Sequence, residues 1–94
     1  MINRNFDAEM RAKAVVRAGL LLYHIDEAIS LVVLCQKHGI QVLGIDSFDI
    51  SNDHTMPVME HSIDFSSESP TRYKDAVSYL ESKRDLDLVF EIIY

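Results

Sequence analysis

The stretch that decides the fold runs from Asp26 to Ile50 and reads DEAISLVVLCQKHGIQVLGIDSFDI. Apolar residues recur at helical spacing through its first half, which predicts a helix from about Asp26 to His38. Asp26 is the expected N-cap, because its carboxylate can accept a hydrogen bond from a free backbone N–H of the first turn. Gly39 suits the left-handed position that ends a helix, with Ile40 folding back onto the last turn.

The second half of this stretch predicts a β-strand over 41–50. Leu43 and Ile45 share one face of such a strand, whereas Phe48 has the opposite parity. Two arrangements would explain why the apolar residues change from one face of the strand to the other. A β-bulge near Asp46–Ser47 restores a single apolar face, or the strand is buried on both sides.

On the N-terminal side, the residues from Asp7 to Ala18 predict another helix, with Asp7 as its N-cap and strong helix formers after it. Gly19 is the expected C-terminal stop of this helix. The segment 20–24 is either a linker or an additional piece of helix.

On the C-terminal side, a turn over 51–54 leads into a second strand from Thr55 to Phe65. Pro57 cannot donate a hydrogen bond to a neighbouring strand, so it indicates an edge strand or the start of a strand. Ser69 can cap a third helix that has Pro70 at its first position. The segment from Leu88 to Tyr94 is apolar on nearly both faces, which is typical of an interior strand.

These elements predict an α/β (α+β) fold in one small domain spanning residues 1–94. It has two N-terminal helices, a β-hairpin, a helix and a C-terminal strand, and a three-stranded mixed sheet packs against the helices. The first strand of the hairpin is expected in the middle of the sheet, with the last strand antiparallel beside it.

The composition is that of an ordinary globular protein, with 48% apolar and 26% charged residues among 94. Cys35 is the only cysteine, which excludes an intrachain disulfide and a cysteine-based metal cluster. No targeting segment or membrane span is recognisable, so we expect a cytoplasmic protein with no membrane partner.

The negative charge is concentrated in one third of the chain. Residues 38–71 contain six carboxylates and no Lys or Arg, and their charge equals the net charge of −6 of the whole chain. Such a block repels nucleic acid and attracts a basic partner, although a solvated surface that maintains solubility is the other interpretation. The candidate partner-binding residues are Asp46, Asp49, Asp53, Glu60, Asp64 and Glu68.

Other kinds of site find little support in the residues. The spacing from Asp49 to Glu60 matches a calcium-binding loop, but His54 stands where that loop needs glycine and the flanks predict strands. His61 lies among the apolar positions of the second strand and is interpreted as a half-buried, hydrogen-bonded residue. We therefore expect no catalytic residue, no metal site and no cofactor.

The run Lys37–Phe48, KHGIQVLGIDSF, resembles the G-I-x-V-L-G-x-D segment of small bacterial immunity proteins. These proteins accompany polymorphic toxins, including contact-dependent growth inhibition toxins. The resemblance continues through a polar hairpin, a helix with Tyr73, Ala76 and Tyr79–Leu80, and a terminal apolar strand, and so covers roughly the last 60 residues. It implies a non-enzymatic inhibitor that binds one toxin domain and blocks it.

The charge distribution agrees with this implication. Toxins that cleave or bind nucleic acid have basic clefts, and an acidic protein can occupy such a cleft by imitating phosphate. We therefore expect an immunity protein that binds a basic toxin domain, for which a nuclease is one candidate. We expect no small-molecule substrate. Two alternatives remain open: a small regulatory or ligand-binding module with a pocket near Gly44, and a small enzyme that uses His61 with nearby carboxylates.

Overall fold

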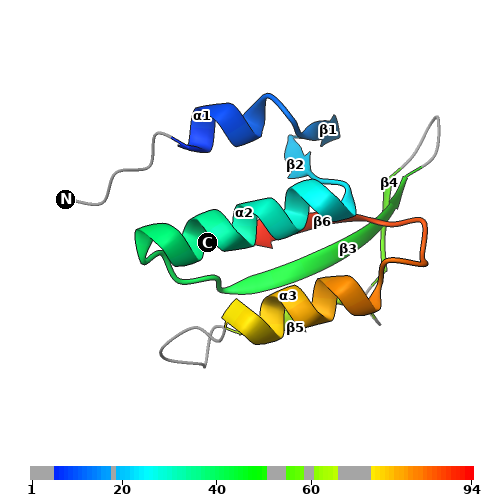
Figure 1. Cartoon of the computed structure of the whole chain (residues 1–94). Helices are drawn as coiled ribbons and strands as arrows, with labels where there is room; N and C mark the ends of the chain where they lie inside the picture. Colours follow the sequence, from blue (N-terminus) through cyan, green and yellow to red (C-terminus); the bar gives the residue numbers. More distant parts are fainter. Residues whose placement is uncertain (1–5, 18, 51–54, 59–60, 66–72) are drawn as a thin grey trace.

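The computed structural model describes residues 6–17, 19–50, 55–58, 61–65 and 73–94 (Figure 1). This described part contains helices and antiparallel strands in the chain order α1 (Phe6–Arg11), β1 (Val15–Arg17), β2 (Leu20–Leu22), α2 (Ile25–His38), β3 (Gly44–Ile50), β4 (Thr55–Pro57), β5 (Ile63–Asp64), α3 (Tyr73–Ser82) and β6 (Val89–Ile93).

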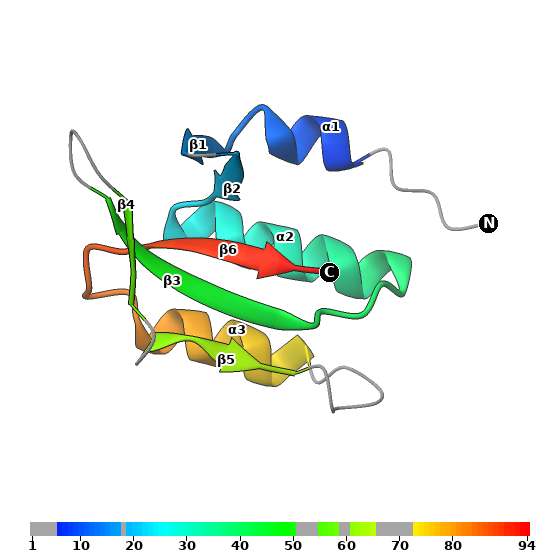
Figure 2. The same cartoon turned by 180° about the vertical axis from the view of Figure 1, so that it is seen from behind.

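Strand β3 is the centre of the larger sheet. It pairs with β6 along one edge and with β4 and β5 along the other, and all three pairings are antiparallel. Helices α2 and α3 lie together on one face of this sheet, whereas Figure 2 shows β6, β3 and β5 in front when the molecule is seen from behind. The α+β class and the predicted place of β3 next to an antiparallel last strand are confirmed. The prediction of a mixed, three-stranded sheet is wrong.

The main core lies between this sheet and the two helices. The register pairs Ile45 with Ile92 and Ser47 with Phe90, so these four side chains share the face that contacts the helices. Leu31 of α2 and Leu80 of α3 meet them there, and both are fully buried. Burial of each such side chain contributes about 1.5–3 kcal/mol by transfer estimates.

Helix α2 ends as predicted and begins differently. Gly39 has a φ of 68°, and the N–H of Ile40 donates to the carbonyl of Cys35 at 2.8 Å. The N-cap is His24 and not Asp26, and the His24 side chain makes no capping hydrogen bond. Asp26 instead lies in the first turn, where its charge complements the helix dipole.

The predicted helix from Asp7 to Ala18 is wrong beyond Arg11. Strands β1 and β2 follow, with Arg17 opposite Leu20 and Gly19 at a φ of 80° in the turn between them. Packing explains the change, because Leu22 of the hairpin is fully buried in a second apolar cluster with Phe48 and Val89. This tertiary contact outweighs the helix propensity of the alanines.

The predicted strand from Thr55 to Phe65 is divided in two. Phe48 pairs with Pro57 and Ile45 pairs with Ile63, so the partner strand uses more residues than β3 over the same distance. The irregularity therefore lies in the partner, and the bulge predicted at Asp46–Ser47 is wrong, since β3 pairs with β6 without a break. Ile45 and Ser47 are buried on one face of β3 and Phe48 is buried on the other, whereas Asp46 on this second face is only partly buried.

The segment between β4 and β5 is anchored to β3 by Ser47. The Ser47 hydroxyl donates to the carbonyl of His61, its backbone N–H donates to the hydroxyl of Ser62 at 3.3 Å, and its carbonyl accepts from the N–H of Val58 at 2.8 Å. Pro57 ends β4 on an edge of the sheet, as predicted. The predicted turn over 51–54 and the predicted helix start at Ser69–Pro70 lie outside the described residues.

Candidate functional site

The face of the sheet that is turned away from α2 and α3 carries acidic side chains from three strands. Because side chains alternate along a strand, Gly44 and Asp46 face away from the core that contains Ile45. The register places Asp64 of β5 opposite Gly44 and Glu91 of β6 opposite Asp46. We call this surface the open face; its residues are Gly44, Asp46, Asp64, Glu91 and Ile93, and Leu43, which directly precedes β3, borders it at the depression.

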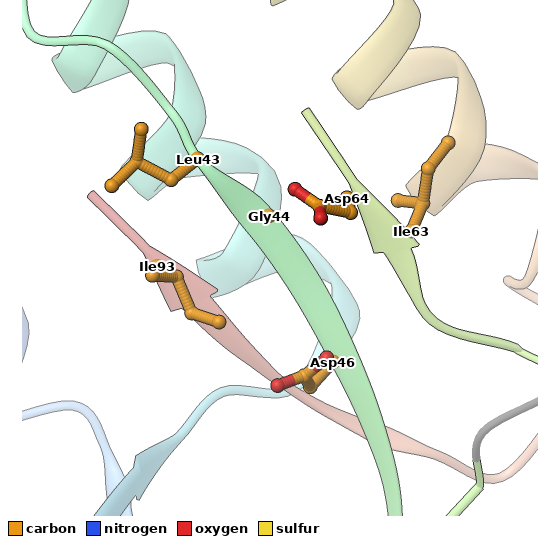
Figure 3. Close-up of a pocket in the computed structure, with 6 residues that line it drawn as sticks. All are labelled: Leu43, Gly44, Asp46, Ile63, Asp64 and Ile93. Atoms are coloured by element: carbon orange, nitrogen blue, oxygen red, sulfur yellow. The ribbon is translucent and has the colours of Figure 1, made fainter. Parts of the chain in front are cut away.

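A shallow depression of about 360 Å³ is hollowed into the open face. It is lined by Leu43, Gly44, Asp46, Ile63, Asp64 and Ile93 (Figure 3). Leu43 and Ile93 lie on one side of Gly44, and Asp64 lies on the other (Figure 3). A Cβ atom on Gly44 would come within 3.1 Å of the Ile63 carbonyl oxygen, so the glycine permits the close approach of β5 to β3.

The rim of the depression is apolar. Leu43 and Ile93 are each 38% exposed, and the Leu43 N–H donates to the Ile93 carbonyl at 2.6 Å. Contiguous exposed apolar patches that are bordered by polar residues mark surfaces that bind other molecules. The hydrogen bond fixes these two residues side by side, so the rim is a preformed feature.

Two of the carboxylates on the open face repel each other. Asp46 and Glu91 are directly opposite on neighbouring strands, where like charges are destabilising. Burial, and secondarily the charge of Asp46, raise the pKa of Glu91 above its ordinary value. Glu91 also borders a second cavity of about 220 Å³ between the β1–β2 hairpin and β6, together with Leu21 and Tyr94.

The structure brings together only some of the predicted site residues. Asp46 and Asp64 both line the depression. Asp49 is exposed on β3 but has the opposite parity to Asp46, so it does not belong to the open face. The remaining three candidates lie outside the described residues: Asp53, Glu60 and Glu68.

Sequence reasoning missed Glu91, because the search for acidic residues stopped at the block 38–71. The signal was nevertheless present. Glu91 is the only charged residue between Leu88 and Tyr94, and a carboxylate in an otherwise apolar strand marks the position where that strand meets water.

His61 belongs to the segment between β4 and β5 and is not among the residues that line the depression. Its Nδ1 atom is buried without a hydrogen-bond partner among the described residues. Burial is the main cause that raises the pKa of Tyr79.

The described residues contain no group of three or more His, Cys, Asp or Glu side chains that could hold a metal ion. None of the described helices is long and apolar enough to cross a membrane.

No family model, curated protein or solved structure matches this chain. Its function is therefore inferred from the open face.

Proposed function

We propose that this protein is an immunity protein that binds a basic toxin domain through its open face and thereby neutralises it. One observation carries the proposal: Asp46, Asp64 and Glu91 come from three different strands and gather on one sheet face beside an apolar rim. The action is stoichiometric binding, without catalysis, cofactor or small-molecule substrate.

The physical basis is the combination of apolar contact with charge of one sign. Leu43 and Ile93 supply apolar surface whose burial favours association. Carboxylates around it select a basic partner, speed its diffusional encounter and reject acidic surfaces. A toxin domain that acts on nucleic acid offers a surface of this kind, because it must attract phosphate.

The position of the motif residues also supports the proposal. The run Lys37–Phe48 that resembles the immunity proteins forms the end of α2, the connection that follows it and the first part of β3. Leu43, Gly44 and Asp46 belong to this run and line the depression. The residues that carry the resemblance therefore also build the candidate surface.

The test uses the C-terminal domain of the protein that the gene directly upstream encodes. We expect this domain to arrest cells when it is expressed alone and to be harmless when this chain is expressed with it. The triple variant Asp46→Asn/Asp64→Asn/Glu91→Gln should keep its fold by circular dichroism, lose binding to the purified domain and lose protection.

The matched control is the triple variant Asp49→Asn/Asp85→Asn/Asp87→Asn. It removes the same number of charges at exposed positions outside the open face, so protection should persist. A harmless upstream domain, or full protection by the open-face variant, contradicts the proposal. Equal loss of protection in both triple variants would show that net charge and not the open face is responsible.

A second candidate function is a small ligand-binding module, which the depression at Gly44 favours. Its volume of about 360 Å³ lies within the range of small-molecule sites, although such sites are usually more enclosed. A thermal-shift screen with small organic cations tests it. A ligand that raises the thermal unfolding midpoint of the native protein, but not that of the Asp46→Asn variant, would favour this function over toxin binding.

A further inference from the structure

The depression on the open face has the shape and charge to receive one side chain of a partner. Asp64 is opposite Gly44, and Asp46 follows Gly44 by two residues on the same face of β3. The two aspartates are therefore diagonal neighbours on adjacent strands, whose Cα atoms lie about 7–8 Å apart. Gly44 has no side chain, and it lines the depression together with both aspartates.

The opposite side of the depression is apolar. The Cδ1 atom of Ile93 would lie 3.8 Å from a Cβ on Gly44, so this side chain lies directly beside the glycine. Leu43 stands beside it and is partly exposed. A side chain that enters here meets methyl and methylene groups along its stem and carboxylates at its end.

A cation at this position would also relieve the repulsion within the open face. Asp46 has two acidic neighbours. Asp64 lies diagonally from it on β5, and Glu91 lies directly opposite it on β6. Like charges directly opposite destabilise a sheet, and a positive group bound at Asp46 offsets this effect. The complementary occupant is thus long, apolar along its stem and positively charged at its tip.

We propose that the depression binds one arginine side chain of the partner protein, with its stem against Ile93 and Leu43 and its guanidinium between Asp46 and Asp64. The proposal rests on the proposed function, since the toxin domain supplies the arginine. It identifies the contact that the open face makes with that partner.

Arginine fits this site better than lysine for two reasons. Its guanidinium has five N–H donors in a rigid plane, so it can bond carboxylates on two sides at once. It is also less strongly hydrated than an ammonium group and packs well on apolar side chains. Lysine offers a compact charge that holds its water more tightly.

The experiment titrates the full chain with the blocked tripeptide acetyl-Gly-Arg-Gly-amide and follows backbone amide resonances by NMR. We expect saturable shifts at Gly44, Asp46, Asp64 and Ile93, with millimolar affinity. The tripeptide with lysine should bind more weakly, and the tripeptide with citrulline, a neutral analogue of arginine, should not bind. Asp46→Asn should weaken binding of the arginine peptide by about fivefold, whereas Asp49→Asn should leave it unchanged.

Three results would overturn the proposal: no saturable shifts on the open face, equal affinity for arginine and lysine peptides, or equal weakening by Asp46→Asn and Asp49→Asn. Asp49 serves as the matched control because it is an exposed aspartate of the same strand on the other face. The outcome is separable from that of the toxin experiment. Toxin binding without peptide binding removes only the arginine contact, and peptide binding without toxin binding removes only the immunity function.

Discussion

The folded state disfavours ionisation of Glu91. Its pKa is raised above its ordinary value in the folded state by burial and by the nearby Asp46, so the folded state binds its proton more tightly than the unfolded state does. The contribution of Glu91 is therefore neutral at a pH below the ordinary carboxyl pKa. It becomes destabilising as the pH rises through the raised value.

We predict that Glu91→Gln raises the thermal unfolding midpoint at pH 7 and that the increase shrinks as the pH falls below about 4. The gain should be smaller in a background that already carries Asp46→Asn, because the two carboxylates are opposite each other. Thermal unfolding followed by circular dichroism at both pH values measures it. A change of the same size at both pH values would show that packing, and not ionisation, is responsible.

Gly44 has a steric role that also belongs to the residue scale. A methyl group there would meet the backbone carbonyl of Ile63 at 3.1 Å, and a backbone atom moves away less easily than a side-chain tip. We predict that Gly44→Ala costs roughly 1 kcal/mol in urea unfolding, through displacement of β5. Hydrogen exchange at the Phe65 amide, which donates to the Leu43 carbonyl at 2.7 Å, should accelerate more than exchange at the Ile40 amide in the α2 cap.

At the scale of elements, β6 combines a buried face with the open face. Phe90 is fully buried against the helices, whereas Ile93 is 38% exposed on the other side. We predict that Phe90→Ala lowers the free energy of unfolding by about 3–5 kcal/mol. Ile93→Ala, the control on the same strand, should lower it by about 1 kcal/mol or less. Equal effects of the two changes would contradict the assignment of the faces.

Ser47 holds the segment between β4 and β5 against β3 by hydrogen bonds. This residue is fully buried, and its hydroxyl donates to the His61 carbonyl. We predict that Ser47→Ala costs about 1–3 kcal/mol, because it leaves a partly buried carbonyl without that donor. Ser62→Ala should cost less, since the hydrogen bonds of Ser62 are long, at 3.3 and 3.4 Å. Urea unfolding of the two variants provides the comparison.

The sequence predicted those elements whose local signals and packing agree. Helix α2 ends at Gly39 as expected, and the apolar pattern of β6 identified a strand beside the centre of the sheet. The prediction was wrong for β1 and β2, because the alanine-rich sequence there favours a helix locally. The hairpin is stabilised by its packing against Phe48 and Val89, which are distant in the chain. Register between β3 and its partners is likewise a tertiary property, so the division into β4 and β5 had no local signal.

The candidate site was likewise predicted only in part, because strand pairing between distant residues decides which carboxylates share a face. Asp46 and Asp64 were predicted as members of an acidic block, and the antiparallel pairing of β3 with β5 places them on one face. Asp49 was included by its proximity in sequence, which does not account for the alternation of side chains along β3. Glu91 joins the site through a pairing between residues 45 positions apart in the chain, which no local pattern encodes.

At the scale of the whole molecule, the net charge of −6 and the open face would act together on the proposed association with a basic partner. Charge that is spread over the surface steers a basic partner from a distance and is screened by salt, because the Debye length is about 8 Å near physiological ionic strength. Carboxylates that are desolvated in the complex act at contact distance and are screened much less. The rates of association and dissociation should therefore respond differently to salt.

We predict that the rate of association with the proposed toxin domain falls as NaCl rises from about 50 to 500 mM, whereas the dissociation rate changes little. The control variant Asp49→Asn/Asp85→Asn/Asp87→Asn should associate more slowly at low salt and dissociate at the native rate. Asp46→Asn should dissociate faster at every salt concentration, because the arginine that we propose to bind here would lose one of its two carboxylate partners. Stopped-flow mixing measures both rates. A dissociation rate that is unchanged by Asp46→Asn would place this carboxylate at the rim of the interface and not at its centre.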